Sequence, residues 1–127
     1  MEEKPIHKIT LDNGLTLELY DHSRPVAGDR WQVSFVARLE VELKREYFEG
    51  PGTPDVSFEE IRKAVGDYAH YHHEKTRNFI AETEKDEVFE GLKERFLDAN
   101  LVYLSSPDFP LKLILRQYQK RLRQRIS

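Results

Sequence analysis

The sequence predicts an α+β domain, in which an N-terminal three-stranded antiparallel meander is followed by three helices packed on one of its faces. The first observation is the alternation of apolar and polar residues within residues 6–43, which is the period of half-buried strands. The second is the helical spacing of apolar residues within residues 58–126, where Gly, Pro and Ser mark the breaks. Because the strands precede the helices, the order favours the α+β class.

The first two strands are expected to form a hairpin around Asp12-Asn13-Gly14. Asn-Gly between alternating apolar runs is a strong hairpin signal. A two-residue loop would turn the apolar sides of the two strands to opposite faces, whereas a three-residue loop pairs Ile9 with Leu17 and gives one apolar face. We therefore predict the three-residue loop, with Gly14 in the left-handed conformation that glycine adopts at least cost.

Residues 21–30 are expected to form a loop by composition, and residues 31–43 to form the third strand. The odd-numbered residues of 31–43 are all apolar, and the even-numbered ones are polar except for Val36. This alternation is typical of an antiparallel strand with one buried face and one solvated face.

The length of the third strand raises the question of what covers its second half. Its 13 residues would span about 43 Å at ~3.3 Å per residue, roughly twice the reach of each hairpin strand. The residues Leu39, Val41 and Leu43 must then pack under the helices or pair with a second chain. We take these three as interface candidates, for self-association or for another protein.

The helical region is predicted to begin with a capping box made by Ser57 and Glu60. Apolar residues then follow one helical stripe as far as Ile80, which predicts a helix over residues 58 to about 81. A strand over residues 67–80 is the alternative. We disfavour it because neither of its alternating faces is apolar.

Two further helices are expected, one over residues 85–100 and one that follows Asp108 and runs to the end of the chain. Leu104 falls off the apolar stripe of the first, so that helix either stops near Asn100 or is buried on two sides. Asp108 can cap the last helix, and Pro110 suits its first turn.

The organisation is predicted to be a single domain, residues 1–127, because one domain commonly takes about 150 residues. The Gly- and Pro-rich residues 49–55 are read as the turn between a sheet region, 1–48, and a helical region, 57–127.

Composition excludes several classes of protein. The chain has a net charge of -3, 39% hydrophobic and 34% charged residues, and no cysteine. It is too apolar for a disordered chain, and without cysteine it has neither thiol catalysis nor a disulfide framework. No apolar run reaches the ~18 residues of a membrane helix, and the first residues do not resemble a signal peptide. We therefore expect a cytoplasmic protein.

Metal-ligating residue types are concentrated in His70-Tyr71-His72-His73-Glu74. On the predicted helix, His70, His73 and Glu74 stand at i, i+3 and i+4 and would share a face. On a strand, His70, His72 and Glu74 would do so. The spacing differs from the His-Glu-x-x-His motif of zinc enzymes. We name His70, His73 and Glu74 as the candidate metal ligands and expect neither a bound metal nor a cofactor.

Positive charge is concentrated in the last helix, since residues 106–127 hold six Lys or Arg and one Asp. The candidate contacts for nucleic acid are Lys112, Arg116, Lys120 and Arg123, which line the face opposite the apolar stripe. Such cations can neutralise phosphates. They can equally complement the helix dipole or form a solvated face, so we expect nucleic-acid binding to be weak.

No motif assigns a catalytic residue. The contiguous Asp21-His22-Ser23 has the residue types of a hydrolase triad, but triad members come together from separate segments. The preferred interpretation is a small, non-enzymatic protein-interaction or structural module, including a self-associating one. The alternatives are a nucleic-acid binder that uses the last helix, and a small metal-dependent enzyme that uses the His70–Glu74 cluster.

Overall fold

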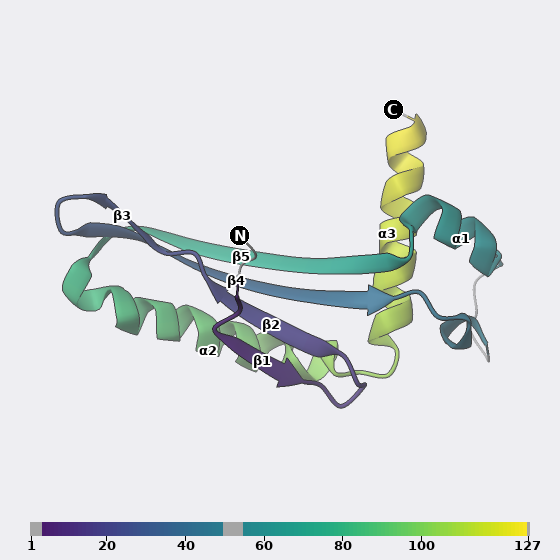
Figure 1. Cartoon of the computed structure of the whole chain (residues 1–127), viewed down its shortest axis with the longest axis horizontal. Coiled ribbons are helices and arrows are strands. Elements are labelled where there is room, and N and C mark those ends of the chain that lie inside the picture. Colours follow the sequence, from purple (N-terminus) through teal and green to yellow (C-terminus); the bar gives the residue numbers. More distant parts are fainter. Residues whose placement is uncertain (1–3, 50–54, 127) are drawn as a thin grey trace.

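The computed structural model describes residues 4–49 and 55–126, apart from the side chains of Arg125 and Ile126. In this part of the chain the fold combines one antiparallel sheet with three α-helices, which confirms the predicted α+β class (Figure 1). The strands are β1 (His7–Thr10), β2 (Thr16–Asp21), β3 (Arg24–Ala27), β4 (Arg30–Glu42) and β5 (Tyr68–Ala81). The α-helices are α1 (Phe58–Val65), α2 (Lys85–Leu104) and α3 (Phe109–Ile126), and 3₁₀ turns cover Arg45–Phe48 and Glu82–Glu84.

The long strand β4 organises the sheet. On one side it pairs with β5 over its full length, from Arg30 to Glu42. On the other side it pairs first with β3 and then with β2, which in turn pairs with β1. The described sheet therefore has β1 and β3 on one side and β5 alone on the other.

The hairpin of β1 and β2 has the predicted register. Ile9 lies opposite Leu17, and Gly14 takes a φ of 88° in the three-residue loop. Asn13 also fixes this loop to the helical layer, because its Nδ2 donates to the carbonyl of Leu104 at 2.8 Å and to that of Ser106 at 2.9 Å.

The core lies between one face of the sheet, here called the inner face, and the helices α2 and α3. The buried face predicted for residues 31–43 is confirmed, since the odd-numbered side chains from Val33 to Leu43 are buried on this face. The other face is not solvated throughout, because Ser34 and Val36 are buried there as well. Phe35 is fully buried, with its ring 5.9 Å from that of Phe89 and 5.4 Å from that of Phe96. The burial of apolar side chains is the main favourable contribution to such a core, and contacts between aromatic rings add to it.

The predicted helix over residues 58–81 is wrong in its second part. Helix α1 ends at Val65, and Gly66 follows with a φ of 98°. The backbone N–H of Gly66 donates a hydrogen bond to the carbonyl of Arg62 at 2.7 Å. The chain then forms β5, which was the disfavoured alternative. Only Ala69 is fully buried in β5, while Lys75 and Arg77 on the same face are exposed. An edge strand covered over part of its length gives only a weak alternating pattern.

The predicted loop over residues 21–30 also needs correction, because it contains β3. All four residues of β3 are exposed, so no pattern of burial marks the strand in the sequence. Gly28, with a φ of 55°, turns the chain from β3 into β4.

The helices occupy different positions relative to the sheet. Helix α2 runs along the inner face and continues to the fully buried Leu104. Helix α3, with Pro110 in its first turn, crosses the end of β5, and its C-terminal half projects beyond the sheet (Figure 1). Helix α1 packs against α3 rather than against the middle of the sheet. No helix among the described residues is both long and apolar enough to span a membrane.

The interface candidates Leu39, Val41 and Leu43 belong to the core of the chain itself. They are only 2%, 0% and 8% exposed. Strand β5 pairs alongside, with Tyr71 opposite Leu39 and Ala69 opposite Val41. Because the chain supplies its own cover, these three residues present no surface to a partner.

Candidate interaction surface

The strand geometry of β5 separates the histidines that a helix would have brought together. His73 lies opposite the core residue Ala37 on the inner face, whereas His70, His72 and Glu74 lie on the other face of the sheet, here called the outer face. The set of His70, His73 and Glu74 therefore does not converge. In the ranges 4–49 and 55–126, no group of three or more His, Cys, Asp or Glu side chains is placed to hold a metal ion.

His73 instead packs as an aromatic side chain. Its ring lies 4.6 Å from that of Phe96 and 6.4 Å from that of Phe35. Burial lowers the pKa of His73, and the neighbouring charges of Lys75 and His72 lower it further. The neutral imidazole is therefore the form that fits this site.

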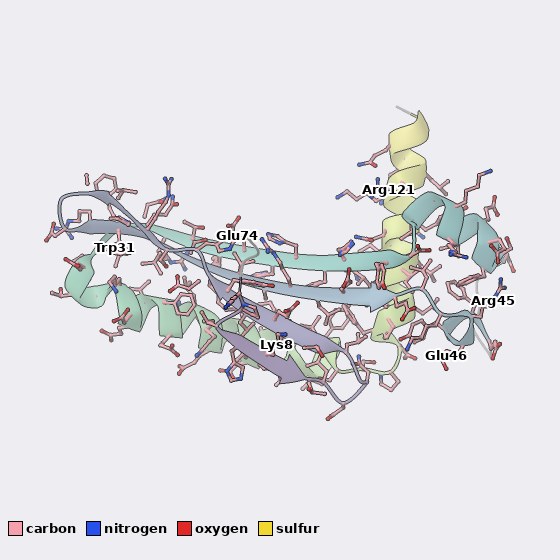
Figure 2. The ribbon with its side chains drawn as sticks, viewed as in Figure 1. Lys8, Trp31, Arg45, Glu46, Glu74 and Arg121 are labelled. Atoms are coloured by element: carbon pink, nitrogen blue, oxygen red, sulfur yellow. The ribbon has the colours of Figure 1, made fainter. Side chains whose placement is uncertain are left out.

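The outer face is the side of the sheet away from α2. Figure 2 shows Glu74 on this side. Its polar groups bond across strands, since Ser34 Oγ lies 3.3 Å from Glu74 Oε1 and 3.1 Å from Thr76 Oγ1. A shallow hollow of about 350 Å³ lies on it, lined by residues of β2, β4 and β5 that include Glu18, Arg38 and His72. The mixture of charge signs gives this hollow no preference for an anion or a cation.

The four cations predicted for the last helix share one exposed face of α3, here called the basic face. They are Lys112, Arg116, Lys120 and Arg123. The last three border a hollow of about 490 Å³. None of the four takes part in an ion pair with a described residue, and Arg116 donates to the hydroxyl of Tyr103 at 2.9 Å.

The helix dipole does not account for this whole face. Cations are favourable at a helix C-terminus, whereas Lys112 stands in the first turns of α3, where the dipole disfavours a positive charge. The projecting half of the helix presents further charge, since Figure 2 shows Arg121 above the sheet, on the side away from α2. The helix dipole can therefore account for Arg123 near the C-terminus but not for Lys112.

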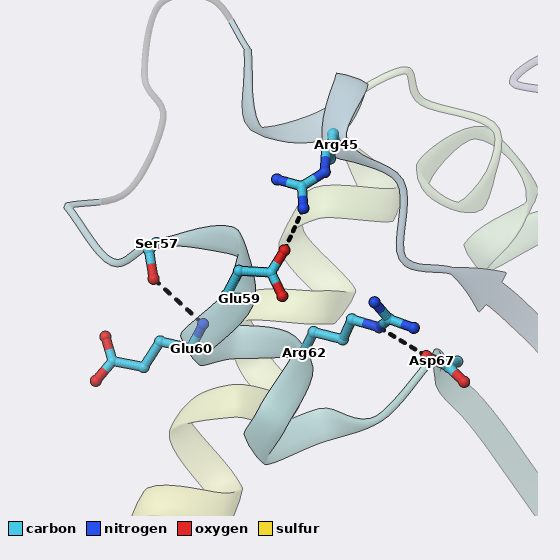
Figure 3. A network of polar contacts seen from close by, with 6 residues as sticks. All are labelled: Arg45, Ser57, Glu59, Glu60, Arg62 and Asp67. Atoms are coloured by element: carbon cyan, nitrogen blue, oxygen red, sulfur yellow. Dashed lines mark hydrogen bonds and ion pairs between the residues drawn. The ribbon is translucent and has the colours of Figure 1, made fainter.

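Charges around α1 are arranged differently, because they pair with one another (Figure 3). Arg45 binds Glu59, and Arg62 Nε donates to Asp67 Oδ1 at 2.8 Å. The bond to Asp67, together with the attraction between the two charges, raises the pKa of Arg62. Ser57 accepts the N–H of Glu60 at 3.2 Å, as the capping box predicted. These contacts tie α1 to the 3₁₀ turn that follows β4 and to Asp67, which precedes β5, so we assign them a structural role.

The contact between α3 and β5 is made by a side chain that imitates a neighbouring strand. The N–H of His70 donates to Gln117 Oε1 at 3.1 Å, and Gln117 Nε2 donates to the carbonyl of His70 at 2.8 Å. Both backbone groups of His70 therefore point away from β4. In an antiparallel strand this direction repeats at every second residue.

The same alternation leaves a stretch of the β5 backbone beyond His70 without a neighbouring strand from residues 4–49 and 55–126. The backbone N–H and C=O groups of His72, Glu74 and Thr76 point away from β4, because the register is unbroken from Tyr68 to Arg77. No strand among the described residues pairs with this side of β5. Within the described part of the chain, the hydrogen bond made there is a long one, from Arg77 Nη1 to the carbonyl of Thr76 at 3.5 Å. We call the backbone of these three residues the open edge.

The open edge has a defined limit at each end. Gln117 covers His70 at one end. At the other end a bulge sets Asn78 and Phe79 against the single residue Gln32. Phe79 has a φ of 58° and a side chain that is 70% exposed. A bulky residue rarely takes this conformation, and its ring lies largely in solvent.

Sequence reasoning found the basic face but missed the open edge. Gly66 was the available signal, because a glycine at the end of a helical pattern commonly stops the helix. No sequence signal identified Gln117 as the residue that covers part of β5.

Comparisons with known proteins gave no match: no family model, no curated protein and no solved structure matches the chain.

Proposed function

We propose that this domain is a non-enzymatic protein-interaction module that binds an extended segment of another polypeptide at the open edge of β5. The observation that carries the proposal is the row of outward-facing backbone groups at His72, Glu74 and Thr76, next to a position that Gln117 already covers. An added strand would satisfy these groups in the way a neighbouring strand does.

The limits of the open edge set the length of the segment. From His72 to Thr76 the strand covers about 17 Å at ~3.3 Å per residue, so five residues can pair directly. The partner strand would then meet α3 at one end and the bulge at the other. Exposed edges are often protected by bulges and by charged side chains, and β5 has both, which limits indiscriminate pairing while leaving the backbone accessible.

Self-pairing at this edge is disfavoured by charge. A two-fold pairing centred on the open edge would place Glu74 opposite its own copy. Moving the centre by one residue would place Lys75 opposite its own copy, and like charges directly opposite each other destabilise a strand pair. Centring the pairing on His73 would require the backbone of His70, which Gln117 occupies. The occupant is therefore a different polypeptide.

A titration followed by amide NMR tests the proposal. The probes are three heptapeptides in which Thr alternates with Asp, with Ser or with Lys, each added up to about 1 mM to detect weak binding. We expect at least one probe to shift the amide signals of His72, Glu74 and Thr76. If none of the three shifts these amides, the proposal is wrong.

A backbone variant identifies the groups involved. Glu74→Pro removes the central outward-facing N–H, while Glu74→Ala removes the same side chain and keeps that N–H. Binding should be lost in the first variant and kept in the second. Equal binding by both would contradict edge pairing. Should Glu74→Pro fail to fold, Thr76→Pro with Thr76→Ala gives the same comparison at the end of the open edge.

A further inference from the structure

Building on the edge-binding function proposed above, we infer that the bound segment is acidic, with carboxylates at alternating positions that face Lys75 and Arg77 and a carboxylate-rich end that meets the basic face of α3. The inference rests on three observations: the charge beside the open edge, the position of α3 at its end, and the absence of acidic partners for these cations among the described residues.

The charge beside the open edge is positive on one face only. His73, Lys75 and Arg77 alternate with the open-edge residues and therefore lie on the inner face. Lys75 and Arg77 are exposed, and no ion pair within the described residues includes them. Every second residue of an added strand would lie beside these cations, where a carboxylate is favourable.

The outer face makes the opposite demand. His72, Glu74 and Thr76 project there, and Glu74 is the charged group in the middle of the set. A carboxylate directly opposite Glu74 would be repelled, whereas Thr, Ser or Lys would not. The segment is therefore acidic on one side and neutral or basic on the other, which is a strand pattern of period two.

The end of the open edge leads directly to α3. His72 lies two residues from His70, or about 7 Å along the strand, and His70 contacts Gln117. Lys120 follows Gln117 at i+3 and therefore projects from the same side of the helix. Arg116 immediately precedes Gln117 in the sequence and lies on the basic face. The N- or C-terminal part of the segment would leave β5 at this point and come within reach of Arg116 and Lys120.

The charge of the whole chain makes this recognition local. Residues 1–56 and 57–105 each carry seven cations and eleven anions, a balance of -4 apiece, while residues 106–127 carry +5. An extended acidic ligand is repelled by most of the molecule and attracted to the strip from Arg77 to Arg123. Since the pairs are exposed, salt should weaken the attraction.

The experiment uses the same three heptapeptides with the full chain. We expect the Asp peptide to bind about tenfold more tightly than the Ser peptide, which is what two or three exposed ion pairs supply, and the Lys peptide to bind least. Raising NaCl from about 50 mM to about 300 mM should reduce the preference for Asp. Equal binding of the Asp and Ser peptides at the open edge would overturn the inference and leave the proposed function standing.

Charge reversal separates the two groups of cations. Lys75→Glu and Lys120→Glu should each lower the affinity for the Asp peptide by at least about fivefold and leave the affinity for the Ser peptide unchanged. Lys63→Glu, an exposed position on α1, changes the net charge equally and serves as the control. If Lys63→Glu lowers the affinity for the Asp peptide equally, the effect comes from net charge alone and the inference is overturned.

A nucleic acid is the competing occupant of the basic face. A twelve-nucleotide thymidine oligomer is added to the same protein at about 150 mM NaCl. If it binds α3 more tightly than the Asp peptide does, without shifting the amides of His72, Glu74 and Thr76, the basic face recognises phosphate and the inference is overturned. Weaker binding than that of the Asp peptide supports it.

Discussion

Phe79 combines two properties that individual residues seldom share. It holds a positive φ of 58° and leaves 70% of its side chain in solvent. A left-handed conformation costs a residue with a Cβ about 1–2 kcal/mol, and an exposed ring recovers little of this through burial. The surrounding register of β4 and β5 therefore imposes the conformation on Phe79.

We expect Phe79→Gly to raise the free energy of unfolding by about 0.5–1 kcal/mol, because glycine adopts the conformation without strain but loses more chain entropy on folding. Phe79→Ala, which keeps a Cβ, should not raise the free energy of unfolding. Urea denaturation of both variants measures the difference. Equal stabilities of the Gly and Ala variants would show that the strain is absent.

His73 predicts how stability depends on pH. Burial lowers its pKa, so the folded state binds this proton less readily than the unfolded chain does. The stabilising contribution of the neutral ring is complete above the unfolded pKa of about 6.5 and is lost as the pH falls below it.

We therefore expect the native protein to lose more stability than His73→Phe when the pH falls from about 7.5 to about 5. The phenylalanine variant keeps an aromatic ring beside Phe35 and Phe96 and cannot be protonated. Urea midpoints at both pH values give the comparison. Equal losses of stability in the two proteins would mean that His73 does not contribute to the pH dependence.

At the scale of secondary structure, elements with a strong burial pattern could be predicted and edge elements could not. The β1–β2 register and β4 follow from alternation, because β2 buries Leu17 and Leu19 and β4 buries its odd-numbered residues from Val33 onward. Strand β1 adds only the partly buried Ile9 to this face. In β5, Tyr68, His72 and Thr76 fall on an apparent helical stripe with Ala69, yet only Ala69 is buried. The stripe was a coincidence of spacing, since tertiary pairing with β4 decides the structure.

Gly66 separates α1 from β5, and its conformation gives a direct test. We expect Gly66→Ala to lower the free energy of unfolding by about 1–2 kcal/mol, because its φ of 98° lies where a Cβ is strained. Gly91→Ala, inside α2, should instead stabilise by up to about 1 kcal/mol, since the atoms nearest to the new Cβ belong to the flexible Arg95 side chain, at 3.5 Å or more. Thermal denaturation distinguishes them, and the same sign for both variants would contradict this account.

The candidate site was predictable only in part, for the same reason. The basic face follows from sequence spacing, because Lys112, Arg116, Lys120 and Arg123 repeat with the period of a helix. The open edge depends on which strands pair, and Gln117 becomes a cover for β5 only once α3 crosses the sheet. Leu39, Val41 and Leu43 were candidates because no pattern in the sequence indicated the strand that covers them.

At the scale of the whole molecule, the helices cover one face and one end of the sheet (Figure 1). Among the described residues, no strand pairs with the side of β5 between α3 and the bulge. Charge is also unevenly distributed, with the positive excess on α3. The molecule therefore presents a backbone edge beside a positively charged helix. An extended acidic segment would fit this combination better than a flat protein surface would.

The charges at the open edge predict the state of the isolated chain. We expect a monomer of 15.0 kDa in light scattering, because two-fold pairing of β5 brings like charges together. Lys75→Thr, which removes one of these charges, should increase association at high concentration. A stable dimer of the native chain with protected amides in β5 would contradict the assignment of the open edge to a different polypeptide.

Amide hydrogen exchange along β5 in the free protein tests the central claim most directly. We expect alternation: the amides of Tyr71, His73 and Lys75 are protected by β4, while those of His72, Glu74 and Thr76 exchange quickly. The amide of His70 should be protected in spite of its parity, because Gln117 accepts its hydrogen bond, and Gln117→Ala should release it. Uniform protection from His70 to Thr76 would mean that the edge is already covered and would contradict the account.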